Sequence, residues 1–523
     1  MNVIRLFAEG VWNFQKRVRA QVRRALAHQG GDSPSWLAAP HAALVLILAI
    51  GFGFYAQTLG TWFFHDDLWF LQASDANSFS SYTLDAFDYR SNEPVPELLY
   101  RPLYVVWFYG LFIVFGLNAW AYHLLGVLVH LLSATLLWGI AKKVTGRDAI
   151  AHFAALIFVL HPSYAVAVAF VNNNIVVFST SAYLGSLALF LHYLDGGVRR
   201  SWYYAASLLS FLVALLLHPE TAQLFAVLVL AFLLLRSSGF REALDLRRWL
   251  PFLPFLAVEV GFLGVQALAR QAIDYQTTFQ LGDHMVDNYV RYAAFAVDPF
   301  RAVTAHVPFQ ADSRPLEGWR TWLPLVVAGV PVFWLLAVSR SRPYVSLFAL
   351  CWFLLALLPL STWTFGAVSR KLYVAGPAMG LLGAVLLVTV LDYLADKTPL
   401  RFSLMAPLCA LIIIIPFGAR VIEMTGRFED EAAGYQLLID EVRQSDTAIP
   451  DGARLYLVGV PWNYIAFSGA YRAVQNSFQL YYGLNSVYLT VTDEQLRELD
   501  VPPVPGDIIF HYECPPVCQP PIQ

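Results

Sequence analysis

Residues 42–67 read AALVLILAIGFGFYAQTLGTWFFHDD, an apolar run that ends at two adjacent carboxylates. No Asp, Glu, Lys or Arg occurs between Ser33 and His65. A transmembrane helix needs about 20 consecutive, mostly apolar residues. The stretch therefore predicts a first membrane span over 42–60, with an acidic pair just beyond its end.

The whole chain has the composition of a membrane protein. Of its 523 residues, 58% are hydrophobic and only 14% are charged, whereas soluble domains are about 25% charged. A net charge of −3 argues against nucleic acid as a partner. We therefore expect a polytopic α-helical membrane protein with about 11 spans, the later ones near 119–140, 149–161, 175–194, 202–217, 219–236, 250–268, 320–338, 345–361, 372–391 and 402–420.

The apolar segment 102–117 is the ambiguous one, and the basic residues decide how it is interpreted. Lys and Arg accumulate in short cytoplasmic loops. If 102–117 does not cross, the N-terminal arm and five loops lie inside and hold 19 of the 34 basic residues. A crossing would invert every later loop. We predict that 102–117 is a helix embedded in the outer leaflet of the plasma membrane, with the N-terminus in the cytoplasm.

Three regions follow from this topology. Residues 1–40 form a basic cytoplasmic arm, and 41–420 form the transmembrane domain with an outer loop at 61–118. From 421 to 523 the composition becomes that of a soluble sequence, which predicts a small extracytoplasmic α/β domain. We expect there a helix near 428–445 and short strands at 454–460, 479–482, 486–490 and 507–512.

The acidic pair is the strongest candidate for chemistry. Carboxylates beside an apolar region are costly unless they are paired or used. The ordinary alternative is that Asp66 or Asp67 caps the helix that follows. The pair is also suited to hold Mg²⁺ or Mn²⁺, and the sequence leaves metal dependence open.

Other polar side chains are predicted on the same outer face. Each has an ordinary explanation as a snorkelling side chain, a Pro-terminated helix or a polar turn. Together they suit a sugar that is linked through phosphate to a polyprenol. One carboxylate could deprotonate the acceptor hydroxyl, and cations could hold the phosphate. The candidates for the phosphate are Arg101, Arg370, Lys371, His161 and His218, and the supporting residues are Tyr100, Glu220, Tyr373 and Asn172.

These motifs resemble the GT-C glycosyltransferases, especially the protein O-mannosyltransferases and the transmembrane-and-tetratricopeptide mannosyltransferases. The matching residues are Asp66-Asp67, Tyr100-Arg101-Pro102-Leu103, His123 and His130, His161-Pro162, Glu220, and Arg370 with Tyr373. The resemblance implies an inverting transfer from a polyprenyl-phosphate sugar to an acceptor outside the cytoplasm. It implies that Asp66 is the base, that Arg101 or Arg370 binds the donor phosphate, and that a metal is dispensable.

The chain also departs from that family pattern. Ser369 and Ala375 replace a Glu and a Pro, Pro219 replaces a Lys before Glu220, and the uncharged run 172–174 replaces a charged residue. The sequence after the membrane part shows no tetratricopeptide repeats, so the resemblance does not favour a protein acceptor. The acceptor, whether glycan, lipid or protein, stays open.

Two alternatives to a transferase stay open as well. A transporter or flippase of a lipid-linked glycan predicts polar or helix-breaking residues inside spans, and Pro254, Glu259 and Gln266 are a weak form of that signal. An inactive scaffold of the same fold is the other alternative.

Overall fold

A computed structural model describes residues 40–90, 100–196, 198–236, 245–272, 280–298, 343–364, 366–444, 454–460, 474–480, 487–490, 503 and 507–511. Its longer helices are α2 (Pro40–Tyr55), α3 (Asp66–Ala76), α4 (Phe79–Phe87), α5 (Pro102–Phe115), α6 (Ala119–Thr145), α7 (Asp148–Leu160), α8 (Ala165–Ala169), α9 (Asn174–Asp195), α10 (Arg200–Leu217), α11 (Leu224–Ala231), α13 (Leu253–Ala272), α14 (His284–Val297), α16 (Pro343–Ser361), α17 (Gly376–Lys397) and α18 (Phe402–Gln444). Short 3₁₀ turns include η1 (Ala56–Gly60), η2 (Pro162–Tyr164), η3 (Pro219–Thr221) and η8 (Ser369–Val374).

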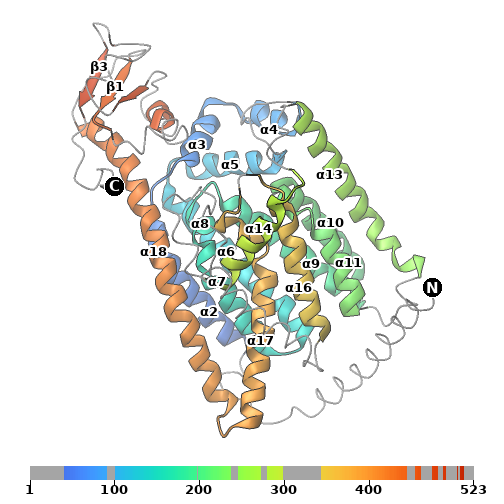
Figure 1. Cartoon of the computed structure of the whole chain (residues 1–523). Helices are drawn as coiled ribbons and strands as arrows, with labels where there is room; N and C mark the ends of the chain where they lie inside the picture. Colours follow the sequence, from blue (N-terminus) through green and yellow to red (C-terminus); the bar gives the residue numbers. More distant parts are fainter. Residues whose placement is uncertain are drawn as a thin grey trace.

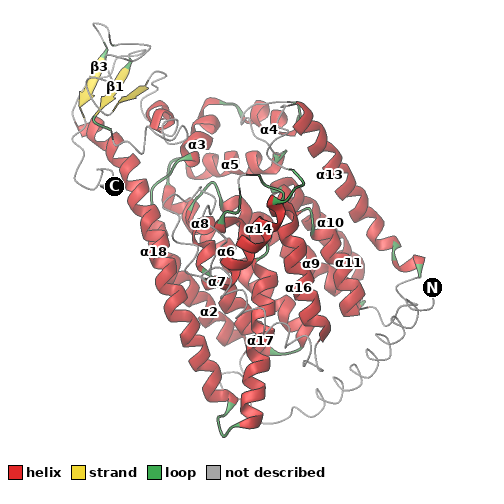
Figure 2. Cartoon of the chain, viewed as in Figure 1, coloured by secondary structure: helices red, strands yellow, loops and turns green. Residues whose placement is uncertain are grey.

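The predicted class, a polytopic helical membrane protein, is confirmed. Within the described residues, nine helical stretches are long and apolar enough to span a membrane, and α7 with α8 makes a tenth, bent by 49°. The remaining predicted span, 320–338, lies outside the described residues, as does the basic arm up to residue 39. Figures 1 and 2 show the long helices side by side, with the few strands at one end.

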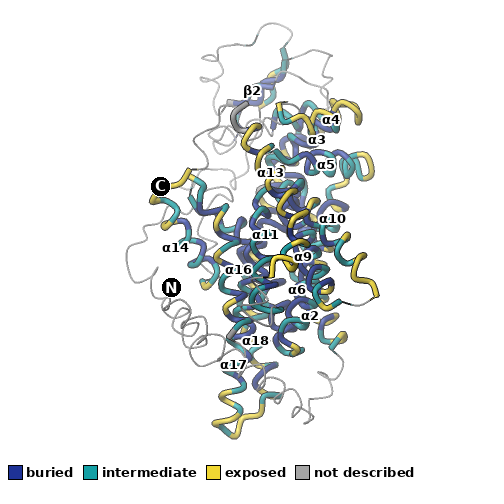
Figure 3. Tube along the Cα trace, turned by 90° about the vertical axis from the view of Figure 1, so that its right-hand side faces the viewer, coloured by how far each residue is buried: buried dark blue, intermediate teal, exposed yellow. Residues whose placement is uncertain are grey.

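Helix α7 runs through the centre of the bundle. Ten of its 13 residues are buried, and it packs against α6, α17 and α2. Small residues permit this close approach: a Cβ on Gly380 of α17 would lie 3.0 Å from the Ala154 carbonyl oxygen. The dark core in Figure 3 follows this central packing. The rigid core fixes the end of α7, where the chain turns at His161.

Helix α5 is too short to span the membrane. Its 14 residues give a length of about 21 Å, against about 30 Å for the hydrocarbon core. The helix ends at Gly116, whose φ of +55° suits glycine. Figure 1 shows α5 lying across the end of the bundle beside α3 and α4. This arrangement agrees with the prediction that 102–117 does not cross.

The C-terminal region continues directly from the last span. The predicted span 402–420 and the predicted helix near 428–445 form one 43-residue helix, α18. Beyond it, β1 (Leu455–Val458), β2 (Val487–Thr490) and β3 (Ile508–His511) form a parallel sheet in the order β2-β1-β3. Leu455 pairs with Val487 on one side and with Ile508 on the other.

One predicted strand is wrong. Residues 474–480 are helical, so Gln479 and Leu480 belong to a helix, while 481 and 482 lie outside the described residues. Parallel neighbours such as β1 and β2 need a crossover connection, which is usually a helix. Val474 and Phe478 are buried with helical spacing and belong to the same apolar cluster as Leu455 and Val487 of the sheet.

The topology around α5 can be tested by labelling. In a variant without native cysteines, we expect cysteines placed at Asp85 and at Asn118, both exposed and on either side of α5, to react with a membrane-impermeant maleimide from the same side. A cysteine at Lys397, at the other end of the bundle, should react only from the opposite side. Labelling of Asp85 and Asn118 from opposite sides would show that α5 crosses.

Candidate functional site

The acidic pair follows a strained turn, which we name the acidic turn (residues 63–67). His65 has φ 47° and ψ −113° and is the non-glycine residue with positive φ in the described part of the chain. Such backbone conformations persist only where the surroundings impose them, and they cluster at functional sites. The turn lets the chain leave the first span and start α3 at Asp66.

The two carboxylates of the pair have different environments. Asp67 is 1% exposed and accepts hydrogen bonds from the backbone N–H of Phe64 at 3.0 Å and of Asn172 at 2.6 Å. Burial raises the pKa of Asp67, and these two donors oppose that rise. Asp67 therefore ties the acidic turn to the segment around residue 172.

Asp66 keeps its carboxylate partly accessible. Its side chain is 37% exposed. Nδ1 of His65 lies 2.7 Å from Oδ1, and Nδ2 of Asn172 donates to Oδ2 at 3.3 Å. These two side-chain contacts orient a carboxylate that is still open to a reactant.

Arg101 and Arg370 are half-buried on the same side of the bundle. Loss of hydration lowers the pKa of Arg370 to about 10, and the negative charges of Asp66 and Glu220 oppose this. The same two carboxylates act on Arg101, whose pKa is also lowered by burial. Arg101 lies over the Tyr104 ring, 4.5 Å from its centroid. Two guanidinium groups therefore share one electrostatic neighbourhood with the candidate base.

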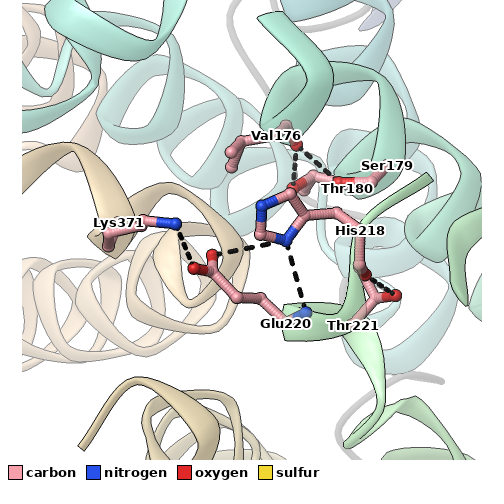
Figure 4. Close-up of polar contacts among 7 residues, drawn as sticks. All are labelled: Val176, Ser179, Thr180, His218, Glu220, Thr221 and Lys371. Carbon is pink, nitrogen blue, oxygen red and sulfur yellow. Dashed lines mark hydrogen bonds and ion pairs between the residues drawn. The ribbon is translucent and has the colours of Figure 1, made fainter. Parts of the chain in front are cut away.

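Lys371 and Glu220 form a buried ion pair, which Figure 4 shows beside His218. Lys371 also lies 4.6 Å from the centroid of the Trp363 ring. The sequence departs from the family pattern in having no Lys before Glu220, and the structure supplies the cation from η8, across the bundle. Burial lowers the pKa of Lys371, and Glu220 opposes that change.

His161 and His218 occupy equivalent local structures. Each precedes a proline that starts a 3₁₀ turn, and its Nδ1 accepts the backbone N–H two residues later at 3.3 Å. Because Nδ1 is the acceptor, the proton of His218 resides on Nε2. Burial, with Lys371 and Arg101 nearby, lowers the pKa of His218, which keeps it neutral at neutral pH.

The side chains of three predicted residues contact groups outside the charged cluster, which we define as Asp66, Arg101, Glu220, Arg370 and Lys371. Nε2 of His161 lies 3.3 Å from the carbonyl of Ala296. The Tyr373 hydroxyl contacts His130 at 2.8 Å inside the core. The Tyr100 hydroxyl donates to the carbonyl of Phe87.

Two polar residues were missed or misjudged from the sequence. His65 carries the strained backbone and contacts Asp66, but only the positive φ reveals it. Gln266, which was weak support for a transporter, donates to the carbonyl of Tyr100 at 2.6 Å and accepts its N–H at 3.2 Å. This pairing anchors the backbone immediately before Arg101.

The residues fit a metal poorly. Asp67 uses both of its oxygens on backbone N–H groups, so the pair does not present two free carboxylates. The residues that the structure describes contain no group of three or more His, Cys, Asp or Glu side chains arranged to hold a metal ion.

The fold and the charged cluster define a multi-pass membrane protein with a half-exposed carboxylate and several cations at one end of its bundle. No family model matches the chain, and no curated protein matches it. Solved structures do show a similar fold.

One such structure is the oligosaccharyltransferase of Archaeoglobus fulgidus tethered with an acceptor peptide. The identity is 14% and the TM-score 0.50, over 88% of this chain and 64% of that chain. This chain thus spans less than two thirds of that enzyme. ArnT from Cupriavidus metallidurans bound to undecaprenyl phosphate is similar at 17% identity and a TM-score of 0.44, over 85% and 89%. The likeness to the oligosaccharyltransferase is one of fold, and it agrees with the predicted resemblance to the GT-C glycosyltransferases.

The strain at His65 can be measured by comparing two variants. His65→Ala and His65→Gly both remove the imidazole, but only glycine adopts φ 47° without strain. We expect the glycine variant to be more stable by about 1 kcal/mol, seen as a higher thermal unfolding midpoint in detergent. Equal midpoints, or a more stable alanine variant, would contradict the assignment of strain.

Proposed function

We propose that this protein is an inverting glycosyltransferase that moves a sugar from a polyprenyl-phosphate donor to an acceptor outside the cytoplasm. The observation that carries the proposal is the accessible carboxylate of Asp66 within the same charged neighbourhood as Arg101 and Arg370. The likeness of fold to an oligosaccharyltransferase supports the class. The acceptor is a glycan, a lipid or a protein.

Asp66 acts as the general base. It accepts the proton of the acceptor hydroxyl while that oxygen attacks C1 of the sugar, and the bond from C1 to the phosphate oxygen breaks. The leaving polyprenyl phosphate is a stable anion, so no general acid is needed. His65 and Asn172 hold the carboxylate for this step, and Asp67 serves by fixing the turn.

Arg101 and Arg370 bind the donor phosphate and stabilise the charge that grows on it. His218 adds an Nε2–H donor nearby. Lys371 adds positive potential, but its ammonium group is already paired with Glu220. The sequence also predicted His161 as a ligand of the phosphate. Both of its ring nitrogens contact backbone atoms, so we assign the phosphate to the arginines instead.

The proposal fixes an orientation. The acidic turn and the C-terminal sheet face the outside of the plasma membrane, and the N-terminus lies in the cytoplasm. This assignment is supported by the distribution of basic residues over the loops.

Substitution of the base tests the chemistry. Asp66→Asn should lower the transfer rate by at least about a hundredfold, because general base catalysis typically contributes that much or more. The assay follows release of polyprenyl phosphate from a panel of polyprenyl-phosphate sugars, beginning with the mannose compound, with envelope extract of a deletion strain as acceptor. Asp75→Asn is the matched control, since Asp75 is exposed on the same helix, α3.

Retained turnover in the Asp66→Asn variant would remove Asp66 as the base. If the wild-type chain transfers none of the sugars but carries a lipid-linked glycan across liposome membranes, the transporter alternative replaces the proposal. Absence of both activities would favour the inactive scaffold.

Substitution of an arginine tests donor binding. Arg370→Ala should raise the KM for the donor about tenfold or more, because hydrogen bonds to charged groups contribute about 1.5–3 kcal/mol. The KM for the acceptor should change little. Arg427→Ala, an exposed arginine on α18, is the control. A change confined to the acceptor KM would contradict the phosphate role.

A further inference from the structure

The part of α18 beyond the last span carries a regular buried seam. Seven buried positions recur at alternating intervals of four and three residues, as in a coiled-coil seam. They are Val421, Thr425, Phe428, Ala432, Tyr435, Ile439 and Val442, and Met424 and Leu438 are buried beside them. A helix that served only as a linker would not need a continuous buried face. The same apolar cluster continues through Leu455 and Val487 into the C-terminal sheet.

The seam packs against the acidic turn. The ring of Phe64 has three edge-to-face neighbours, which we name the aromatic clamp: Phe170 at 5.5 Å, Phe428 at 5.7 Å and Tyr435 at 5.7 Å between ring centroids. Phe428 and Tyr435 are seven residues apart, so two turns of α18 place both on one face. All four rings are buried.

Just before the clamp, α18 is fixed to the end of the first span. Gln57 donates to the carbonyl of Ile422 at 2.6 Å and to the hydroxyl of Thr425. The helix is therefore held both by Gln57, before the acidic turn, and by Phe64, within it, and cannot slide along its axis without breaking these contacts.

Phe64 links the aromatic clamp to Asp67, the neighbour of the candidate base Asp66. Its N–H and carbonyl both bind Asp67, at 3.0 Å each, and His65 follows with its strained backbone. A strained residue keeps its conformation only where the surroundings hold it. The ring of Phe64 fixes one side of His65, and α3 with Asp67 fixes the other.

We propose that Phe428 and Tyr435 are positioning residues that hold the acidic turn, and thereby Asp66, in its reactive orientation. The extracytoplasmic part of α18 is then a component of the active site, and it joins the C-terminal sheet to that site. This inference rests on the proposed function for its effect on rate, but its effect on the acidic turn does not depend on any activity.

The test uses the full-length protein in detergent. Phe428→Leu and Tyr435→Leu keep a large apolar side chain but remove the ring, whereas Tyr435→Phe keeps the ring. Leu437→Ala, on the exposed face of the same helix, is the matched control. Two quantities are measured: transfer kinetics, and hydrogen exchange of peptides covering residues 60–72.

We expect both leucine variants to lower kcat about ten- to a hundredfold, because small misplacements of a reactive group have effects of that size. The KM for the donor should stay nearly unchanged, and exchange in 60–72 should become faster. Tyr435→Phe and Leu437→Ala should behave like wild type. In a Phe64→Leu background, Phe428→Leu should have little further effect, since its contact with the turn is already lost.

Unchanged exchange in 60–72 in folded leucine variants would overturn the inference, as would an undiminished kcat or an equal loss with Tyr435→Phe. If the wild-type chain has no transferase activity, the proposed function fails. In that case faster exchange in 60–72 still supports the clamp and unchanged exchange still refutes it.

Discussion

The site depends on holding positively charged side chains, partly removed from water, at the end of an apolar helical bundle. Removing an ion from water is costly unless an opposite charge stands close by. Lys371 meets this requirement by pairing with Glu220, and Arg101 and Arg370 lie within the field of Glu220 and Asp66. The carboxylates thus help to keep the cations charged, and in the proposed function these cations bind a phosphate. The arrangement explains why the cations at this end of the bundle lie beside carboxylates.

The bundle assembles this cluster from distant segments. The acidic turn follows the first span, Asn172 lies in the bend after α7, Glu220 starts η3, and Arg370 and Lys371 lie in η8 before α17. Close packing around α7 fixes the ends of these spans relative to one another. Orientation within the cluster is then local: backbone donors hold Asp67, and His65 and Asn172 hold Asp66.

The sequence was sufficient for the class of fold, because apolar runs of span length and the basic residues of the loops are direct consequences of the bilayer. The charge of the loops also predicted that α5 does not cross the membrane, and the 14-residue length of α5 agrees with that prediction. The sequence could not show that α18 continues past residue 420, since the composition there is soluble and only the seam at 421–442 signals packing. The strand predicted at 479–482 failed because a short apolar run does not distinguish a strand from a buried helix. Among the candidate site residues, Asp66 and Arg370 were proposed from motifs. The pairing of Glu220 with Lys371 could not be predicted, because the two residues are 151 positions apart in the chain.

The most direct test of the central claim is a structure of the protein with a polyprenyl phosphate bound. The account predicts that the phosphate lies within hydrogen-bond distance of the guanidinium groups of Arg101 and Arg370, with the carboxylate of Asp66 facing the side from which an acceptor would attack. A phosphate bound elsewhere in the protein, or an Asp66 carboxylate turned away from it, would contradict the account.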